Sequence, residues 1–240
     1  MSDDEIDLMV CIAGENNQVV EKYATVFLDT LARKCDLKRV NTFIVLRECL
    51  PVADSVRRLA EKTGFNIVNC PLPRFAGALE DTSQVLDWMV ANCGVAPWFA
   101  VSHFDIEFHG DYFKWARGVM PDAHMVGRHL DGLVLMRREA YSRCRVGFCG
   151  IDRVGSESAL SLDVGELLGL RMLTLSLKHV LYGKDFGLFT HYREGASATR
   201  TPQEQVESAK ESVKVEIAAD GRTVIHLHAL VGDRWCVACS

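Results

Sequence analysis

The sequence predicts an α/β fold: a mostly parallel, Rossmann-like sheet with helices on both faces, followed by a C-terminal helix and β-hairpin. Short apolar runs alternate with segments whose apolar residues recur at helical spacing over much of the first 144 residues. Some runs, such as Trp98 to Val101, are continuously apolar, as in strands buried on both faces. Alternating strands and helices favour parallel strands joined by helical crossovers.

The first part of the chain supplies strands and helices in alternation. The leading strand ends in the polar turn that begins at Gly14, and the following helix carries Val20, Phe27 and Leu31 on one face. Asp54 is placed to cap the second helix. We predict strands over residues 8–13, 40–46, 65–70 and 98–101, and helices over residues 18–34, 54–62 and 80–93.

The later elements are shorter, and they divide the chain into two parts. We predict helices over residues 111–118 and 137–144, a helix start near Asp163, and strands over residues 132–136 and 186–191. Pro202 favours a further helix start, and Asp220-Gly221 joins two alternating runs, 213–217 and 223–229, into a hairpin. Residues 1–200 are therefore expected to form the main domain, and residues 201–240 an extension.

The composition excludes several classes of protein. With 240 residues and a net charge of −5, the chain is not expected to present a general nucleic-acid surface. No stretch approaches the ~20 apolar residues of a transmembrane helix, and the acidic N-terminus is unlike a secretion signal. Nine cysteines scattered among apolar residues indicate a reducing, cytoplasmic location. Cys236 and Cys239 have zinc or redox spacing, but without a second such pair a structural or incidental role is favoured.

An acidic pair at the end of an apolar strand is the strongest chemical signal. Asp105 and Glu107 are two residues apart, and in an extended chain such residues point to the same side. Both carboxylates could then bind one hard cation, Mg²⁺ or Mn²⁺, which would neutralise a diphosphate. The alternative is two solvated acids at a strand edge. His103 would share their side, although a packed or surface histidine is the simpler interpretation.

In the order of these segments, the chain resembles nucleotide-sugar glycosyltransferases of the type-A fold, in particular the inverting family 2. The resemblance covers about residues 6–200, with Asp105-Ile106-Glu107 in the place of the family's Asp-x-Asp motif. A small polar turn ends the first strand, and a late His-containing segment precedes a Gly/Ser turn. The matching segments are residues 14–17, 74–79, 104–113, 132–141, 162–164 and 189–197.

The resemblance implies an activity and a set of site residues. It implies a metal-dependent, inverting transfer of a sugar from a nucleoside-diphosphate sugar to an acceptor hydroxyl. Mn²⁺ or Mg²⁺ would be held by Asp105, Glu107 and His191, and the donor would lie against Gly14, Asn16 and Arg74. Asp163 would be the general base. A solvated Arg74, a structural His191 and a purely capping Asp163 are the alternatives, and Arg137 and Arg138 are expected to cap or solvate a helix.

Some positions depart from the family pattern and keep other functions open. Leu46-Arg47-Glu48 stands where the family has an acid that reads the nucleotide base, and Glu107 and Asp163 are closer in sequence than is usual. A nucleotidyltransferase would carry a Gly-rich, basic loop after the first strand, whereas this loop contains Glu15. A non-catalytic domain that binds a partner or carbohydrate is the other alternative. The apolar face of the hairpin needs a cover, which predicts a homodimer.

Overall fold

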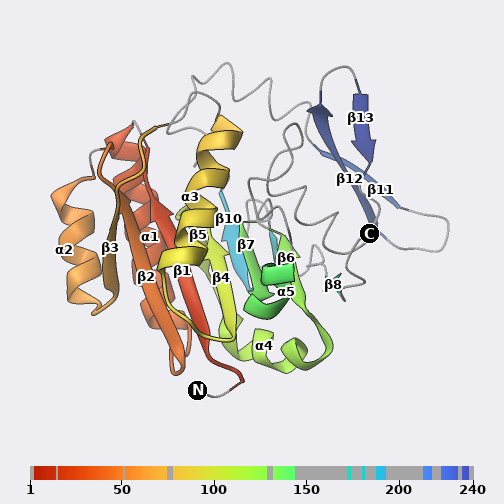
Figure 1. Ribbon diagram of the computed structural model, residues 1–240, viewed down its shortest axis with the longest axis horizontal. Coiled ribbons are helices and arrows are strands. Elements are labelled where there is room, and N and C mark those ends of the chain that lie inside the picture. Colours follow the sequence, from red (N-terminus) through yellow and green to blue (C-terminus); the bar gives the residue numbers. More distant parts are fainter. Residues whose placement is uncertain are drawn as a thin grey trace.

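The computed structural model describes residues 3–14, 16–50, 52–74, 78–128, 132–143 and 188–192, and the backbone of five further strands. Its main sheet has seven described strands in the order β3-β2-β1-β4-β7-β6-β8 (Figure 1). The bounds of these strands are β1 Ile6–Ile12, β2 Val40–Arg47, β3 Asn66–Cys70, β4 Trp98–Ser102, β6 Met125–Arg128, β7 Leu133–Arg137 and β8 Met172–Leu173.

The pairing of the strands confirms a mostly parallel sheet and adds two antiparallel contacts. β1 pairs in parallel with β2 and β4, and β2 with β3. β7 runs antiparallel to both β4 and β6, so its end lies beside the start of β4, where Arg137 pairs with Trp98. β6 was not predicted from the sequence, because four residues carry too little periodicity and this strand depends on its pairing with β7.

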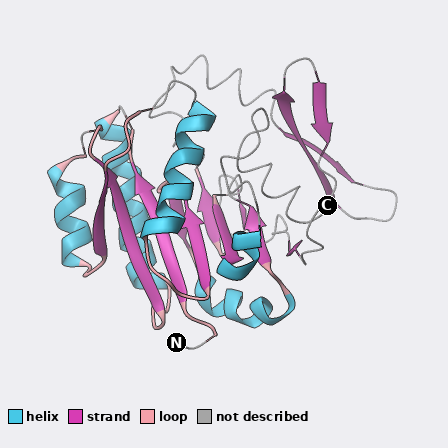
Figure 2. Cartoon of the chain, viewed as in Figure 1, coloured by secondary structure: helices cyan, strands magenta, loops and turns pink. Residues whose placement is uncertain are grey.

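Helices cover both faces of the sheet, as predicted (Figure 2). Buried residues of α1, α2 and α4 share one hydrophobic cluster with β1 side chains such as Leu8 and Val10. Buried residues of α3 and α5 pack on the opposite face with Met9 and Phe99. The helices are α1 Asn17–Lys34, α2 Asp54–Lys62, α3 Ala78–Asn92, α4 Tyr112–Val119 and α5 Arg138–Arg143, with a 3₁₀ turn over Met120–Asp122.

Two helix starts show how the caps form, and the second corrects a prediction from the sequence. Asn16 caps α1, its side-chain oxygen accepting a hydrogen bond from the Val19 N–H at 3.3 Å. Asp54 was predicted to cap α2, but Ala53 occupies the cap position and Asp54 is the first helical residue. There its negative charge interacts favourably with the helix dipole.

Two smaller sheets complete the described structure. One contains β5 Ile106–Phe108, β10 Phe189–His191 and β9 Val180–Leu181, with β10 in the centre. The other contains the predicted hairpin, β11 Val213–Ile217 and β12 Thr223–Val231, and a third strand, β13 Arg234–Val237, that the sequence analysis did not predict. The predicted helix starts at Asp163 and Pro202 lie outside the described residues.

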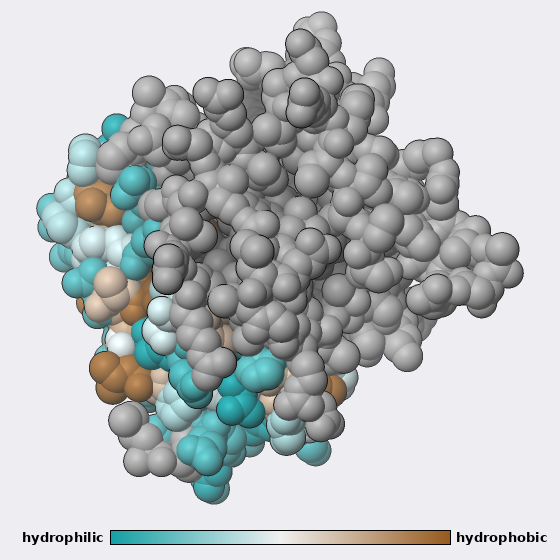
Figure 3. Space-filling view, turned by 45° about the vertical axis from the view of Figure 1, so that its right-hand side comes forward, coloured by the Kyte–Doolittle hydropathy of each residue, from teal (hydrophilic) through white to brown (hydrophobic). Residues whose placement is uncertain are grey.

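The described surface is mainly hydrophilic. In Figure 3, single hydrophobic residues lie among hydrophilic ones over the coloured part of the molecule. Val95 and Tyr192 are the large hydrophobic side chains that are exposed among the described residues, at 72% and 37%. In the part of the chain that the structure describes, no helix combines the length and apolar content needed to cross a bilayer.

Candidate metal centre

The predicted donor-binding residues follow the carboxyl ends of the parallel strands. Gly14 is buried just after β1, Asn16 is exposed at the start of α1, and Arg74 is exposed in the segment after β3. Asp105 follows β4, which lies beside β1. Ligands of open α/β sheets bind at this edge. The fold thus brings these segments to the edge where a ligand is expected.

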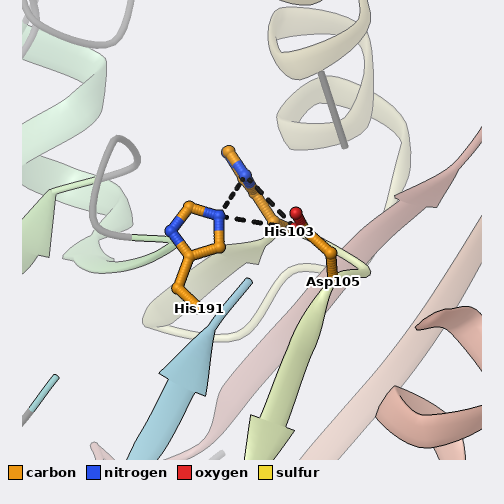
Figure 4. Close-up of side chains that lie close together, drawn as sticks. All are labelled: His103, Asp105 and His191. Carbon is orange, nitrogen blue, oxygen red and sulfur yellow. Dashed lines mark hydrogen bonds and ion pairs between the residues drawn. The ribbon is translucent and has the colours of Figure 1, made fainter. Parts of the chain in front are cut away.

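Three side chains meet beyond the end of β4 (Figure 4). His103 and Asp105 come from the bend between β4 and β5, and His191 is the last residue of β10. His103 Nδ1 lies 3.1 Å from His191 Nε2 and 3.7 Å from Asp105 Oδ1, and His191 Nε2 lies 3.4 Å from the same carboxylate oxygen. The structure therefore brings Asp105 and His191 together, as predicted, and adds His103.

This group has the dimensions of a metal site. One potential ligand atom from each residue lies within 4.8 Å of the other two. Because nitrogen and oxygen ligands lie about 2.0–2.2 Å from a bound cation, two ligands of one cation can be at most about 4.4 Å apart. The three measured separations lie below that limit. Asp105 and His191 are almost fully buried, and buried carboxylates are retained in proteins where they are paired or bind a metal.

The backbone around the group determines where each side chain lies. Antiparallel pairing of β5 with β10 aligns Ile106 with His191, and the Tyr192 N–H donates to the Asp105 carbonyl at 3.0 Å. The His103 N–H donates to the Gly132 carbonyl at 2.7 Å. Gly132 has a φ of +99°, and a Cβ atom there would lie 2.8 Å from His191 Cγ. Only glycine fits this position without displacing the imidazole.

Glu107 lies outside this group. It is half-buried in β5 opposite Thr190, and its carboxylate accepts a hydrogen bond from the Tyr192 hydroxyl. The predicted alternation fails because Asp105 lies in a bend rather than in the strand, so the two acids do not follow strand geometry. The sequence signal for His103 was its own i, i+2 spacing from Asp105, which is weaker than the signal of an acidic pair.

The end of β2 also differs from the family pattern. Arg47 is buried there and forms an ion pair with Asp81 of α3, and it donates to the Pro73 carbonyl at 2.6 Å. Burial acts to lower the pKa of Arg47, but the hydrogen bond and charge of Asp81 raise it above its usual value. These two contacts of Arg47 hold the segment between β3 and α3, including Pro73 next to Arg74, at the edge of the sheet.

The proposed base cannot be placed beside these residues. Asp163 lies outside the described residues, as do the segments that flank it. The role of Asp163 therefore rests on the sequence resemblance.

Comparison with known proteins identifies the fold. No family model and no curated protein sequence matches the chain. Among solved structures, Mycobacterium tuberculosis glucosyl-3-phosphoglycerate synthase, in complex with Mn²⁺, UDP and glucosyl-3-phosphoglycerate, has a TM-score of 0.53 at 12% identity over 93% of this chain and 86% of that chain. Staphylococcus aureus TarS 1–349 in complex with UDP has a TM-score of 0.53 at 11% identity over 85% of this chain.

These similarities concern the fold. The matches cover 62% of the TarS 1–349 chain with UDP, so this chain spans less than two thirds of that protein's length. The glycosyltransferase GlyE of Streptococcus pneumoniae matches with a TM-score of 0.50 at 8% identity. The chain has the α/β fold of these glycosyltransferases, as its sequence predicted.

Proposed function

We propose that this protein is a metal-dependent glycosyltransferase that moves a sugar from a nucleoside-diphosphate sugar to an acceptor hydroxyl with inversion. The observation that carries the proposal is the group formed by His103, Asp105 and His191 beyond the end of β4. It lies at the sheet edge where ligands of such folds bind. The glycosyltransferase fold makes a sugar transfer the reaction class to test first.

The three side chains of this group would hold a divalent cation, Mn²⁺ or Mg²⁺. A cation bound there supplies positive charge that stabilises the leaving diphosphate. Mn²⁺ and UDP accompany the M. tuberculosis synthase in its crystal structure, which supports testing this ion and this nucleotide first. Glu107, which the sequence predicted as a ligand, lies outside the group, and Glu107→Gln tests whether it has a role in metal binding.

The remaining roles belong to residues along the same edge. Gly14 allows the donor to approach the end of β1 closely because it has no side chain. The exposed guanidinium of Arg74 can form paired hydrogen bonds with a phosphate, and Asn16 lies at the start of α1. Asp163 is proposed to take the proton of the acceptor hydroxyl as the oxygen attacks the anomeric carbon.

Calorimetry of nucleotide binding and an assay of donor hydrolysis test the proposal together. UDP or GDP should bind in Mn²⁺ or Mg²⁺ and lose most of its affinity in EDTA. Asp105→Ala should abolish the metal-dependent part, whereas Glu61→Gln, which removes an exposed acid on α2, should leave it intact. Equal nucleotide affinity with and without metal would contradict the proposal. Metal-dependent binding without any hydrolysis or transfer would favour the non-catalytic alternative.

The base is tested separately. Asp163→Asn should leave donor binding nearly unchanged and lower turnover about 100-fold or more, the scale expected for losing a general base. Near-normal turnover would move this role to another acid, Asp152 or Glu166.

We also propose a cytoplasmic location and a homodimer formed through the C-terminal strands. The location follows from the scattered cysteines of the sequence. The dimer follows from the alternating apolar residues of β11 and β12, which pair as a hairpin. Light scattering of the full chain at micromolar concentration tests the dimer, and a monomer would contradict it.

A further inference from the structure

We infer that the cation site of this protein selects transition metals, of which Co²⁺ and Zn²⁺ are the clearest probes, over Mg²⁺. The inference rests on the proposed function, in which His103, Asp105 and His191 hold a divalent cation. It deepens that proposal, because two of the three potential ligands in the structure are imidazoles rather than carboxylates.

The chemistry of the ligand atoms favours one class of metal. Imidazole nitrogen suits Zn²⁺, Co²⁺, Ni²⁺ and Fe²⁺, whereas Mg²⁺ prefers oxygen and keeps several of its waters. The predicted site, with Asp105, Glu107 and His191, would have offered two carboxylates and one imidazole. In the structure the Glu107 carboxylate accepts a hydrogen bond from Tyr192, and His103 lies beside Asp105 instead.

The two imidazoles are held in place by the backbone. The side chain of His191 is 3% exposed, its strand is paired with β5, and its Cγ lies 2.8 Å from where a Cβ atom on Gly132 would be. The His103 side chain is 26% exposed, but the backbone N–H of this residue donates a hydrogen bond to the Gly132 carbonyl. A cation that entered between these rings would therefore contact nitrogen, because neither residue is free to leave without disturbing the strand ends.

The same three residues allow a different interpretation without any metal. The two rings meet edge to face with their centroids 4.8 Å apart, and a nitrogen–nitrogen distance of 3.1 Å suits a hydrogen bond between them. In that arrangement one ring nitrogen donates and the other accepts. The group would then only join β10 to the end of β4, and no cation would bind there.

Calorimetric titration of the full-length protein with Mg²⁺, Mn²⁺, Co²⁺ and Zn²⁺, each without nucleotide, decides between these cases. We expect Co²⁺ and Zn²⁺ to bind at least about 10-fold more tightly than Mg²⁺. The affinity for Mn²⁺ should lie between that for Mg²⁺ and that for Co²⁺. The visible absorption spectrum of the Co²⁺ protein gives a second readout that does not depend on activity. Asp105→Asn should lose both the binding and the spectrum.

Two variants sharpen the titration. His103→Asp replaces one imidazole by a carboxylate, so it should raise the Mg²⁺ affinity and narrow the preference for Co²⁺. The double variant Cys236→Ser and Cys239→Ser removes the C-terminal thiol pair as a competing site and should keep the Co²⁺ spectrum. A spectrum lost with these cysteines but kept in Asp105→Asn would overturn the inference.

The outcomes separate the inference from the proposed function. If Mg²⁺ binds as tightly as Co²⁺ and still promotes nucleotide binding, the metal preference is wrong and the metal-dependent function stands. If none of the four cations binds in the presence or absence of UDP, both fail, and the His103–His191 contact is structural. Tighter binding of Co²⁺ and Zn²⁺ that responds to His103→Asp supports the inference.

Discussion

Two buried aspartates lie at opposite ends of the main sheet and have different neighbours. Asp7, near the start of β1, is 0% exposed, and Asp105, beyond the end of β4, is 1% exposed. The Asp7 carboxylate accepts hydrogen bonds from the Ala96 N–H at 2.7 Å and from Arg138 and Asn41 at 3.0 Å. The Asp105 carboxylate lies against two imidazoles, at 3.4 and 3.7 Å.

The difference shows how burial alone fails to identify a functional acid. Asp7 has a permanent cation of the protein itself, because Arg138 is charged at every physiological pH. Arg138 also donates to carbonyls of Val90 and Ala96, which close the amino end of the sheet. Imidazoles are ligands that can share a metal with a carboxylate. We therefore interpret the Asp7 end as structural and the Asp105 end as the candidate metal centre.

Removing Asp7 should have the largest effect on folding. Asp7→Ala leaves the Arg138 charge without its buried partner, and breaking such a pair costs about 3–5 kcal/mol. Urea unfolding should show this loss, whereas Asp105→Ala should cost less stability and instead lose metal binding. If Asp105→Ala destabilises the metal-free protein as much as Asp7→Ala does, the proposed division between the two ends is wrong.

Gly94 tests how tightly the amino end is packed. Its φ is +73°, and a Cβ atom would lie 2.3 Å from the Asp7 carboxylate. Gly94→Ala should therefore cost about 3 kcal/mol or more, through backbone strain and overpacking together. Gly64 is the matched control, because its φ is +74° and a Cβ atom there meets nothing within 4 Å. Gly64→Ala should cost only about 1–2 kcal/mol, and equal losses would show that the contact with Asp7 is unimportant.

Gly132 provides the corresponding test at the metal centre. Gly132→Ala should displace the His191 ring and lower metal affinity about 10- to 100-fold, as loss of support around a metal ligand does. Titration of the folded variant with Co²⁺ measures this effect. Gly94→Ala, titrated under conditions in which it is folded, should retain the wild-type affinity. An unchanged affinity in Gly132→Ala would show that the ring does not need this position.

The smallest expected effect is on the reactivity of Cys93, which lies at the amino end of the sheet. Burial, together with the charges of Cys70 and Asp7, raises the pKa of its thiol to about 11 from 9.0. The thiolate is the reactive form, and the fraction of thiolate falls tenfold for each pH unit below the pKa. Labelling of Cys93 by iodoacetamide at pH 8 should therefore be slow. Exposed Cys49 should label before Cys93, as peptide mass spectrometry would show. Asp7→Asn should speed the labelling of Cys93, because it removes a charge that raises the thiol pKa. Identical rates in the wild-type and variant proteins would show that this charge does not affect the thiol.

Much of the fold was predictable because the signals are local. Apolar runs of four to eight residues and helical spacing identified β1, β2, β3, β4 and their helices within a few residues. The position of Asp105 was predictable for the same reason, since the end of a buried parallel strand marks the ligand-binding edge. Glu107 was predicted from ideal strand alternation, and the bend at Asp105 interrupts that alternation.

Arg138 illustrates the limit of local signals. Arg138 was expected to cap or solvate a helix, and its guanidinium does donate to the Val90 carbonyl in the last turn of α3. Its ion pair with buried Asp7 was not predicted. The pairing depends on the antiparallel direction of β7, which returns the chain to the amino end of β4. The residues of a strand do not determine whether it runs parallel or antiparallel to its neighbours. The pairing of Arg138 with Asp7 could therefore not be predicted from residues 132–144.

The sequence by itself determined the α/β class, the alternation of strands and helices, and the edge at which an acid would meet a ligand. These follow from hydrophobic periodicity, which a chain expresses over a few neighbouring residues. Only the tertiary structure decided which side chains share the candidate metal centre. His103 and His191 are 88 residues apart in sequence. They meet because β10 pairs with β5 and Gly132 leaves room for a ring, and contacts between distant segments arise only when the sheets pack.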